Sequence, residues 1–160
     1  MIALDTNVLV RYIAQDDVRQ SAAATQLIEQ TLSSADPGYI SLVTLLETVW
    51  VMESRYGADA ATVASLLDDL VDTASLLLQD AAAVKTAAQR YARGGVDLHD
   101  CLIVSLAAQR KAQVVTFDTK AAKRAAGHGG RALSGECNRG DSKSAAVDGG
   151  AICKLCDSPE

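Results

Sequence analysis

The chain opens with the apolar run Ile2-Ala3-Leu4, and three polar residues, Asp5, Thr6 and Asn7, follow at once. A short apolar run that ends abruptly in polar residues is typical of a buried strand. Asp5 would then lie at the carboxyl end of that strand, where open α/β sheets bind their ligands. Apolar residues at helical spacing follow over 8–13, so a helix is expected next, capped by Thr6 or Asn7.

This pattern of one strand followed by two helices continues along the chain. Short apolar runs predict further strands at 39–40, 74–78 and 113–118, the last with Asp118 at its tip. Helical stripes predict helices at about 19–32, from Ser41 to Gly57, from Asp59 past Val71, from Asp80 to Arg93 and from Asp97 to Arg110. Strands that alternate with pairs of helices predict a mainly parallel sheet covered by helices on both faces.

The periodicity stops after Lys123-Arg124, so we expect a domain over 1–126 and a mobile tail over 127–160 that is rich in Gly and Ser. One short strand is expected in the tail, near 131–133. His128, Cys137, Cys153 and Cys156 form an irregular set of possible zinc ligands, and an unstructured extension is the preferred interpretation.

Composition narrows the classes of protein. The 160 residues suffice for one domain, with 49% apolar and 4% aromatic residues, so Ala, Leu and Val must build the core. No apolar stretch approaches the roughly 20 residues of a membrane span, and no secretory signal is evident, so a cytoplasmic protein without a membrane partner is expected. In that compartment the four cysteines would be free thiols or metal ligands.

Four acidic residues stand at positions that a parallel sheet can bring together. Asp5 and Asp118 follow predicted strands, whereas Glu47 and Asp100 lie on helices able to pack beside them. Clustered carboxylates repel one another unless a hard cation neutralises them, and Mg²⁺ or Mn²⁺ prefers such oxygen ligands. A metal-activated water could then attack a phosphodiester. Because the chain has 20 acidic residues, ordinary capping and surface acids are the simpler alternative.

The net charge of −5 disfavours a protein that merely coats nucleic acid, but it does not exclude an enzyme acting on one. Basic residues able to hold phosphates are Arg90, Arg93, Arg110, Lys111, Lys120, Lys123 and Arg124. His99 would suit a general base but is expected to be a surface residue at a helix start. Tyr12 and Trp50 lie on apolar stripes and are expected in the core or at a dimer contact.

Four motifs in order resemble those of PIN-domain ribonucleases, and the VapC-type toxins of type II toxin–antitoxin pairs are the most similar group. The resemblance extends from Met1 to Arg124. The motifs are Ile-Ala-Leu-Asp-Thr-Asn-Val-Leu-Val at 2–10, Leu-Glu-Thr-Val at 46–49, Asp-Leu-His-Asp-Cys-Leu-Ile at 97–103 and Val-Thr-Phe-Asp at 115–118.

The resemblance implies an α/β fold of the three-layer α/β/α sandwich type, with a central, mainly parallel sheet. It also implies RNA cleavage that depends on Mg²⁺ or Mn²⁺. It also implies a homodimer and inhibition by a cognate antitoxin. Asp5 and Asp100 would bind the metal directly, and Glu47 and Asp118 would complete the catalytic pocket. Supporting roles would fall to Thr6, Asn7, Thr116 and Asp97. Asp97 is expected to be a helix cap or to act from behind the metal ligands, whereas Asp100 is preferred as the ligand. Unlike the family, the chain continues into a Gly-rich tail, which places its last strand in question.

Two other functions remain open at this stage. A catalytically inactive PIN-like domain would bind RNA or a protein partner, and a cleavage assay with and without chelator separates the two cases. A phosphoryl-receiving signalling domain also gathers acids around Mg²⁺, but it needs a second acid beside the first, whereas Thr6-Asn7 follow Asp5.

Overall fold

The computed structural model describes residues 1–94, 96–118 and 131–132. The remainder of the 127–160 tail, including the four possible zinc ligands, lies outside these residues, as do Lys120, Lys123 and Arg124. The domain boundary expected at 126 therefore stays a prediction. No helix in the described part of the chain is long and apolar enough to cross a membrane.

A three-stranded parallel sheet, in the order β1-β2-β3, forms the middle of the molecule. Its strands are β1 (Ile2–Ala3), β2 (Gly38–Ile40) and β3 (Leu76–Leu78). Ile2 lies opposite Gly38, which in turn lies opposite Leu76. The side chain of Leu32, at the end of the preceding helix, packs so closely on the start of this central strand that a Cβ at Gly38 would lie 2.6 Å from Leu32 Cδ1. This close approach explains why glycine begins β2.

The helices follow the predicted order. They are α1 (Thr6–Ala14), α2 (Val18–Thr25), the π-helix η1 (Gln26–Thr31), α3 (Leu42–Tyr56), α4 (Ala60–Asp72), α5 (Ala81–Tyr91) and α6 (Leu98–Gln109). The helix predicted at 19–32 is thus divided, because its second half takes the wider π geometry.

Side chains at the helix starts explain where these helices begin. Ser41 and Asp59 accept hydrogen bonds from Thr44 N and Thr62 N, as expected of N-caps. The cap of α1 is Asp5 itself, so the expectation that Thr6 or Asn7 would cap this helix was wrong. Asp5 can serve because the chain is still extended there, after β1, and the helix begins one residue later.

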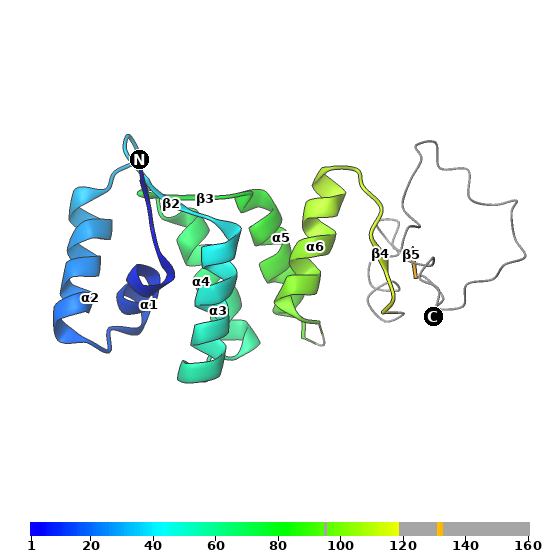
Figure 1. Cartoon of the computed structure of the whole chain (residues 1–160), viewed down its shortest axis with the longest axis horizontal. Helices are drawn as coiled ribbons and strands as arrows, with labels where there is room; N and C mark the ends of the chain where they lie inside the picture. The colour runs from blue at the N-terminus through cyan, green and yellow to red at the C-terminus, as the bar shows by residue number, and fades with distance from the viewer. Residues whose placement is uncertain (95, 119–130, 133–160) are drawn as a thin grey trace, which may run out of the picture.

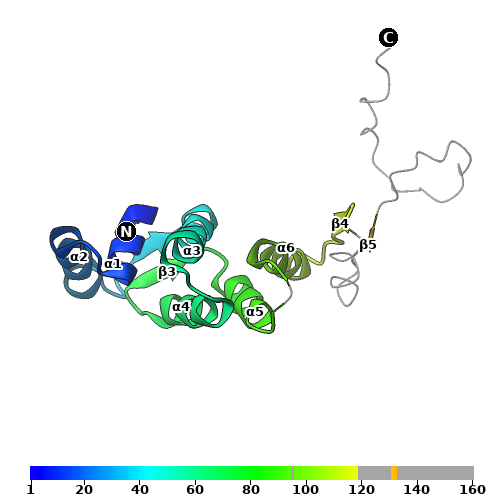
Figure 2. The ribbon, with the colours of Figure 1, turned by 90° about the horizontal axis from the view of Figure 1, so that it is seen from below.

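Helices cover both faces of the sheet. Figure 2 shows α3 on one side and α4 and α5 on the other, with β3 between them. Side chains from every layer meet in one core, which includes the fully buried Leu9, Ile28, Ile40, Leu67, Val63 and Val84. The arrangement is the three-layer α/β/α class that the sequence predicts.

The last strand departs from that prediction. β4 (Val115–Thr116) does not join the main sheet but pairs in parallel with β5 (Arg131–Ala132). The short strand expected near 131–133 is therefore present, although its partner is β4 alone. Figure 1 shows this two-stranded unit beyond α6, at the opposite end of the molecule from the N-terminus.

Candidate functional site

The carboxyl end of β1 places Asp5, Thr6 and Asn7 beside the middle of α3. The Thr6 hydroxyl, buried at 6% exposure, donates a 2.6 Å hydrogen bond to Glu47 Oε2. Both residues line one cavity with Asp5 and Asn7. Residues that are 41 positions apart in sequence thus contribute two carboxylates, a hydroxyl and an amide to the same pocket.

Asp5 is held by the start of α1. Its Oδ2 accepts hydrogen bonds from Asn7 N at 3.4 Å and from Asn7 Nδ2 at 3.2 Å. The predicted bracing of Asp5 by Asn7 is therefore correct, whereas Thr6 supports Glu47 instead. The other carboxylate oxygen of Asp5 has no hydrogen bond among these, and the side chain is exposed, so it can take a ligand from the pocket.

The cavity has a volume of about 360 Å³ and combines charged, aromatic and apolar walls. Besides the residues already named, it is lined by Val10, Arg11, Asp16, Trp50, Val51, Arg55 and Tyr56. Trp50 is 58% exposed and Tyr56 40% exposed, so both rings are accessible to a ligand. Of the two places expected for Trp50, the core is excluded by this exposure, because Trp50 lies on the side of α3 that carries Glu47, and a dimer contact stays a prediction.

A network of three side chains closes one side of this pocket. Tyr56 Oη donates to Asp16 Oδ2 at 2.5 Å, and Arg11 Nη1 lies 2.6 Å from both oxygens of the same carboxylate. The hydrogen bonds from Tyr56 and then Arg11 lower the pKa of Asp16, and the carboxylate raises the pKa of Tyr56 in return. Arg11 is thus neutralised in part, which leaves Arg55 as the other basic residue of the pocket wall.

Asp97 and Asp100 lie at the start of α6, outside this pocket. Asp97 is the N-cap, accepting hydrogen bonds from His99 N at 2.8 Å and lying 2.9 Å from His99 Nδ1, as the cap interpretation requires. His99 is exposed, in line with its expected place at a helix start. Asp100 occupies the first turn as predicted and is half-buried, but it does not line the cavity.

Thr116 lies on β4, in the separate two-stranded unit, and Asp118 follows two residues later. The Asp118 backbone N–H donates to Thr116 Oγ1 at 3.0 Å, which holds the two residues in a local turn. The predicted meeting of all four acids at one edge is not what the structure has: Asp5 and Glu47 converge, and Asp100 and Asp118 do not join them. For Asp118 the reason is that β4 is not a strand of the main sheet.

The donor set of the pocket fits a hard cation in part. Across the described ranges, no group of three or more His, Cys, Asp or Glu side chains is arranged to hold a metal ion. Mg²⁺, however, is commonly bound by one or two carboxylates, with water and substrate phosphates completing its shell. Asp5 and Glu47 supply those two carboxylates, and Thr6 and Asn7 add further oxygen ligands of the type that Mg²⁺ and Mn²⁺ prefer.

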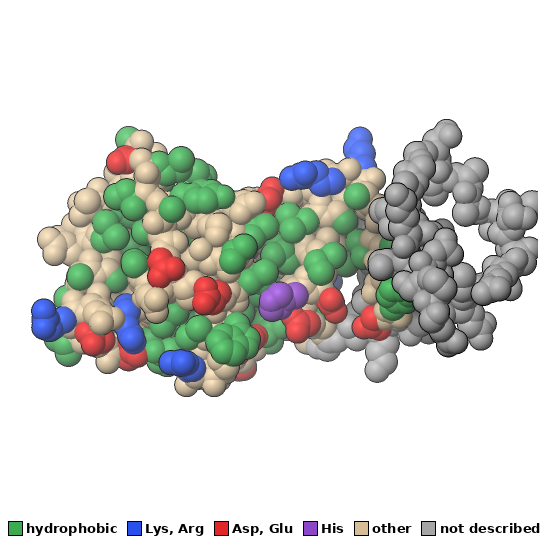
Figure 3. Space-filling view, viewed as in Figure 1, with side chains coloured by type: hydrophobic (Ala, Val, Ile, Leu, Met, Phe, Trp, Pro, Cys, Tyr) green, Lys and Arg blue, Asp and Glu red, His purple; other side chains and the backbone are tan. Residues whose placement is uncertain are grey.

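Four of the basic residues indicated by the sequence as able to hold phosphates lie in the described ranges, and none of them lines the cavity: Arg90, Arg93, Arg110 and Lys111. Arg11 and Arg55 line it instead. The signal for these two was weak, because each stands singly within a helix. Figure 3 shows acidic, basic and apolar side chains interspersed over this face, with no continuous basic band among the residues it colours.

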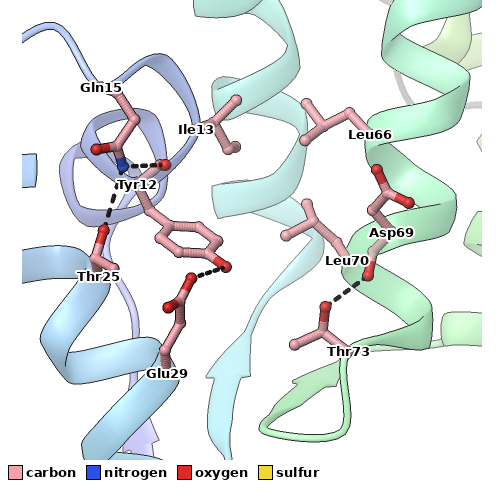
Figure 4. Close-up of a pocket in the computed structure, with 9 residues that line it drawn as sticks. All are labelled: Tyr12, Ile13, Gln15, Thr25, Glu29, Leu66, Asp69, Leu70 and Thr73. Atoms are coloured by element: carbon pink, nitrogen blue, oxygen red, sulfur yellow. Dashed lines mark hydrogen bonds between the residues drawn. The ribbon is translucent and has the colours of Figure 1, made fainter.

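A second groove, of about 480 Å³, lies between α1, the α2–η1 segment and α4. Figure 4 shows its apolar floor of Ile13, Leu66 and Leu70, with the carboxylates of Glu29 and Asp69 on opposite walls. Tyr12 Oη donates to Glu29 Oε1 at 3.2 Å. The groove therefore combines apolar contact area with negative charge.

Comparison with known families bears on the whole of this architecture. A family model described as "PIN domain" matches residues 2–127. Neither the curated proteins nor the solved structures gave a match to the chain. The matched segment covers most of the 160 residues and includes the sheet, all the helices and the pocket at the end of β1. Because PIN domains are generally nucleases, the match also places the chain in a nuclease fold. The chain therefore belongs to the PIN-domain family.

Proposed function

We propose that this protein is a divalent-metal-dependent endoribonuclease that hydrolyses RNA phosphodiester bonds, using Mg²⁺ or Mn²⁺. The observation that supports this most strongly is the pocket in which Asp5 and Glu47 lie beside Arg55 and the exposed Trp50. The pocket combines ligands for a hard cation, a group for phosphate and an aromatic surface for a base. An RNA strand offers a matching partner for each of them: a scissile phosphate that binds the cation, neighbouring phosphates and unstacked bases.

In this proposal each side chain has a distinct task. Asp5 and Glu47 hold the cation. Thr6 binds one carboxylate oxygen of Glu47, so that the second oxygen stays available to the cation. When bound, the cation would lower the pKa of a coordinated water and offset charge on the scissile phosphate. Arg55 attracts the neighbouring phosphates. Asp100, Asp118 and Thr116 remain candidates for the same reaction, and Asp97 is retained as a cap.

Single-stranded RNA is the form of substrate that the pocket suits. Unstacked bases bind by stacking on aromatic side chains, and Trp50 and Tyr56 offer two such rings on the pocket wall. The net charge of −5 argues against tight non-specific binding to a duplex. Recognition would therefore depend on local stacking and phosphate contacts.

The test compares two aspartates that cap helices in the same way. Asp5→Asn keeps a capping side chain but loses a charged ligand, so cleavage of single-stranded RNA in Mg²⁺ should fall at least 100-fold. Asp17→Asn, at the cap of α2, lies outside the cavity and should cleave like the unchanged protein. Mg²⁺ should raise the melting temperature of the unchanged protein and of Asp17→Asn, but not of Asp5→Asn. Equal cleavage by Asp5→Asn would refute the assignment.

The toxin role and the antitoxin partner are part of the proposal, and the groove in Figure 4 supports them. Its floor is apolar, and Glu29 and Asp69 lie on opposite sides of it. Such a groove suits a partner segment that places a Lys or Arg between apolar residues. We also place the protein in the cytoplasm, the compartment in which its four cysteines would be thiols or metal ligands.

Charge reversal tests the partner proposal. Asp69→Lys should weaken binding of the protein encoded by the adjacent gene at least tenfold, because the carboxylate that would pair with a basic side chain of the partner becomes a positive charge that repels it. Asp72→Lys is the matched control, since Asp72 lies on the same helix outside the groove. RNA cleavage by both variants should be unchanged, as neither residue lines the nuclease pocket. Equal binding by the two variants would remove the groove from the proposal.

An inactive RNA-binding domain is the alternative, and one observation favours it: of the four predicted acids only Asp5 and Glu47 line the pocket, and its third carboxylate, Asp16, is bonded to Arg11 and Tyr56. A domain of that kind would bind RNA without cutting it. RNA binding by such a domain would be the same with and without a chelator of divalent cations, and no cleavage would be seen in either case. A metal-dependent enzyme instead stops cutting on chelation and resumes when Mg²⁺ is restored.

A further inference from the structure

A third hollow of the surface lies between α1 and the α2–η1 segment and is called the α1–α2 groove here. It has a volume of about 290 Å³, and its apolar lining comes from Val8, Ala23, Ala24 and Leu27. Figure 2 shows α1 and α2 side by side, and the two helices are in contact. Because α2 contributes two alanines, each with a single methyl group, the space between the helices stays open.

The α1–α2 groove is continuous with the nuclease pocket, because Asn7 and Arg11 line both. Asn7 is one hydrogen bond away from the proposed metal ligand, since its Nδ2 donates to Asp5 Oδ2 at 3.2 Å. The groove therefore begins where the site for the cation and the scissile phosphate ends. A nucleotide next to that phosphate would reach the groove with its base.

Two amide side chains give the groove an acceptor and a donor without a hydrogen bond in the described part of the chain. Asn7 uses Nδ2 for Asp5, which leaves Oδ1 as the acceptor. Gln20 accepts a 2.9 Å hydrogen bond from Arg11 Nε at its Oε1, which leaves Nε2 as the donor. A ligand of the groove thus meets both kinds of hydrogen-bonding group beside an apolar surface.

Arg11 forms the wall between the groove and the pocket. Its Nη1 lies 2.6 Å from both carboxylate oxygens of Asp16, and its Nε donates to Gln20, so the guanidinium is held at two places. Asp16 also offsets its charge, which makes Arg11 less suited to holding a phosphate. A planar guanidinium in this state suits stacking on an unpaired base.

We propose that the α1–α2 groove binds one unpaired nucleobase of the RNA, next to the scissile phosphate, and so determines which sequences are cut. The apolar lining covers the base, Arg11 stacks on it, and the free amide groups of Asn7 and Gln20 bond to its edge. The Watson–Crick edge of every base has both a donor and an acceptor. A purely apolar partner segment would instead bury both amide groups without hydrogen bonds.

This inference rests on the proposed nuclease function, since it names the recognition site for the same substrate. Its first test uses binding alone, with the four nucleoside monophosphates and, as a probe without a base, ribose phosphate. In the full chain with chelator present, at least one nucleotide should bind more tightly than ribose phosphate. That nucleotide should also shift the amide NMR signals of Ala23 and Leu27. Binding of all four nucleotides no tighter than ribose phosphate would overturn the proposal.

Filling the groove should remove the contribution of the base. Ala23→Leu should weaken binding of the preferred nucleotide about tenfold, the value of one stacked base, and leave binding of ribose phosphate unchanged. Ala22→Leu is the matched control, because Ala22 is also exposed on α2 but does not line the groove. It should bind every probe like the unchanged protein. Equal loss in the two variants, or no loss in either, would overturn the proposal.

Gln20→Glu tests recognition during cleavage. It keeps an oxygen for Arg11 Nε but replaces the Nε2 donor by an acceptor. The added charge slows all RNAs alike, so the readout is the ratio of kcat/KM between RNAs that differ only in the base next to the cut. This ratio should change about tenfold, whereas Ala22→Leu should retain it.

The two readouts separate this inference from the nuclease function. Cleavage in Mg²⁺ with a base preference that neither Ala23→Leu nor Gln20→Glu changes would overturn the groove and keep the nuclease. Nucleotide binding that Ala23→Leu weakens, in a protein that cuts no RNA, would keep the base site and reject the nuclease.

Discussion

The hydroxyl of Thr6 donates a 2.6 Å hydrogen bond to Oε2 of Glu47, joining the first turn of α1 to the middle of α3. Thr6 is buried and Glu47 is exposed, so a hydroxyl fixed in the interior holds the exposed carboxylate in place. It also orients Glu47 toward the pocket that contains Asp5.

Removing the Thr6 hydroxyl should reduce both stability and cleavage. Thr6→Val keeps the shape of the side chain, so unfolding should become easier by only about 1 kcal/mol, the net value of one hydrogen bond. RNA cleavage should fall about tenfold, because Glu47 loses its orientation. Thr6→Ser retains the hydroxyl and should recover most of the cleavage. Chemical denaturation and initial cleavage rates measure the two effects, and equal cleavage by the Val and Ser variants would contradict the role of Thr6.

Tyr56→Phe should change the titration of Asp16. The hydrogen bond from Tyr56 is the largest cause of the lowered pKa of Asp16, ahead of Arg11. Because the folded pKa lies below the unfolded one, this carboxylate favours the fold at pH values above its unfolded pKa. That contribution is lost as the pH falls through the folded pKa. In Tyr56→Phe the pKa of Asp16 should rise toward its ordinary value, as followed by carboxyl ¹³C NMR. Tyr12→Phe, whose hydroxyl contacts Glu29, should leave it unchanged.

Tyr91 should be the last described tyrosine to ionise. Its hydroxyl donates a hydrogen bond to Glu53 Oε1, which with desolvation raises the pKa of Tyr91 to about 12. Since the folded pKa is raised, this contact favours the fold fully below the ordinary pKa near 10. The contribution is then lost as the pH rises through 12. Ultraviolet difference titration should show a late step that Tyr91→Phe removes and Glu53→Gln moves to lower pH. A late step that persists in Tyr91→Phe would assign it to another residue.

Two glycines should respond to alanine for different reasons. At Gly38 a Cβ would lie 2.6 Å from Leu32 Cδ1 and 3.0 Å from Leu4 Cδ1, so Gly38→Ala should overpack the core and cost about 1–3 kcal/mol. Gly57 has a φ of +66° and no atom near such a Cβ, so Gly57→Ala should cost only about 1 kcal/mol of backbone strain.

Asn tolerates the left-handed conformation, which separates the two causes. Gly57→Asn should be less destabilising than Gly57→Ala, whereas Gly38→Asn should be at least as destabilising as Gly38→Ala. Urea denaturation measures all four variants. If Gly38→Asn were less destabilising than Gly38→Ala, backbone strain and not overpacking would explain the loss of stability at position 38.

The candidate site was predictable where it depends on neighbours along the chain. Asp5 follows an apolar run and caps the next helix, and Asp97 and Asp100 open α6, all of which local pattern indicates. Arg55 and Tyr56 could not be found in this way. They reach the pocket only because α3 packs against α1, and Asp16 then binds Tyr56 across 40 positions.

The sequence by itself determined the order of strands and helices, most of their limits and the membership of a parallel α/β class. Apolar periodicity, capping side chains and glycines act over a few residues, so a short stretch of sequence contains the whole of their signal. The tertiary structure alone decided that Glu47 meets Asp5 through Thr6, that Trp50 is exposed, and that β4 pairs with β5 and not with the main sheet. These outcomes depend on packing between distant segments and on competition for one sheet edge, which no local pattern encodes.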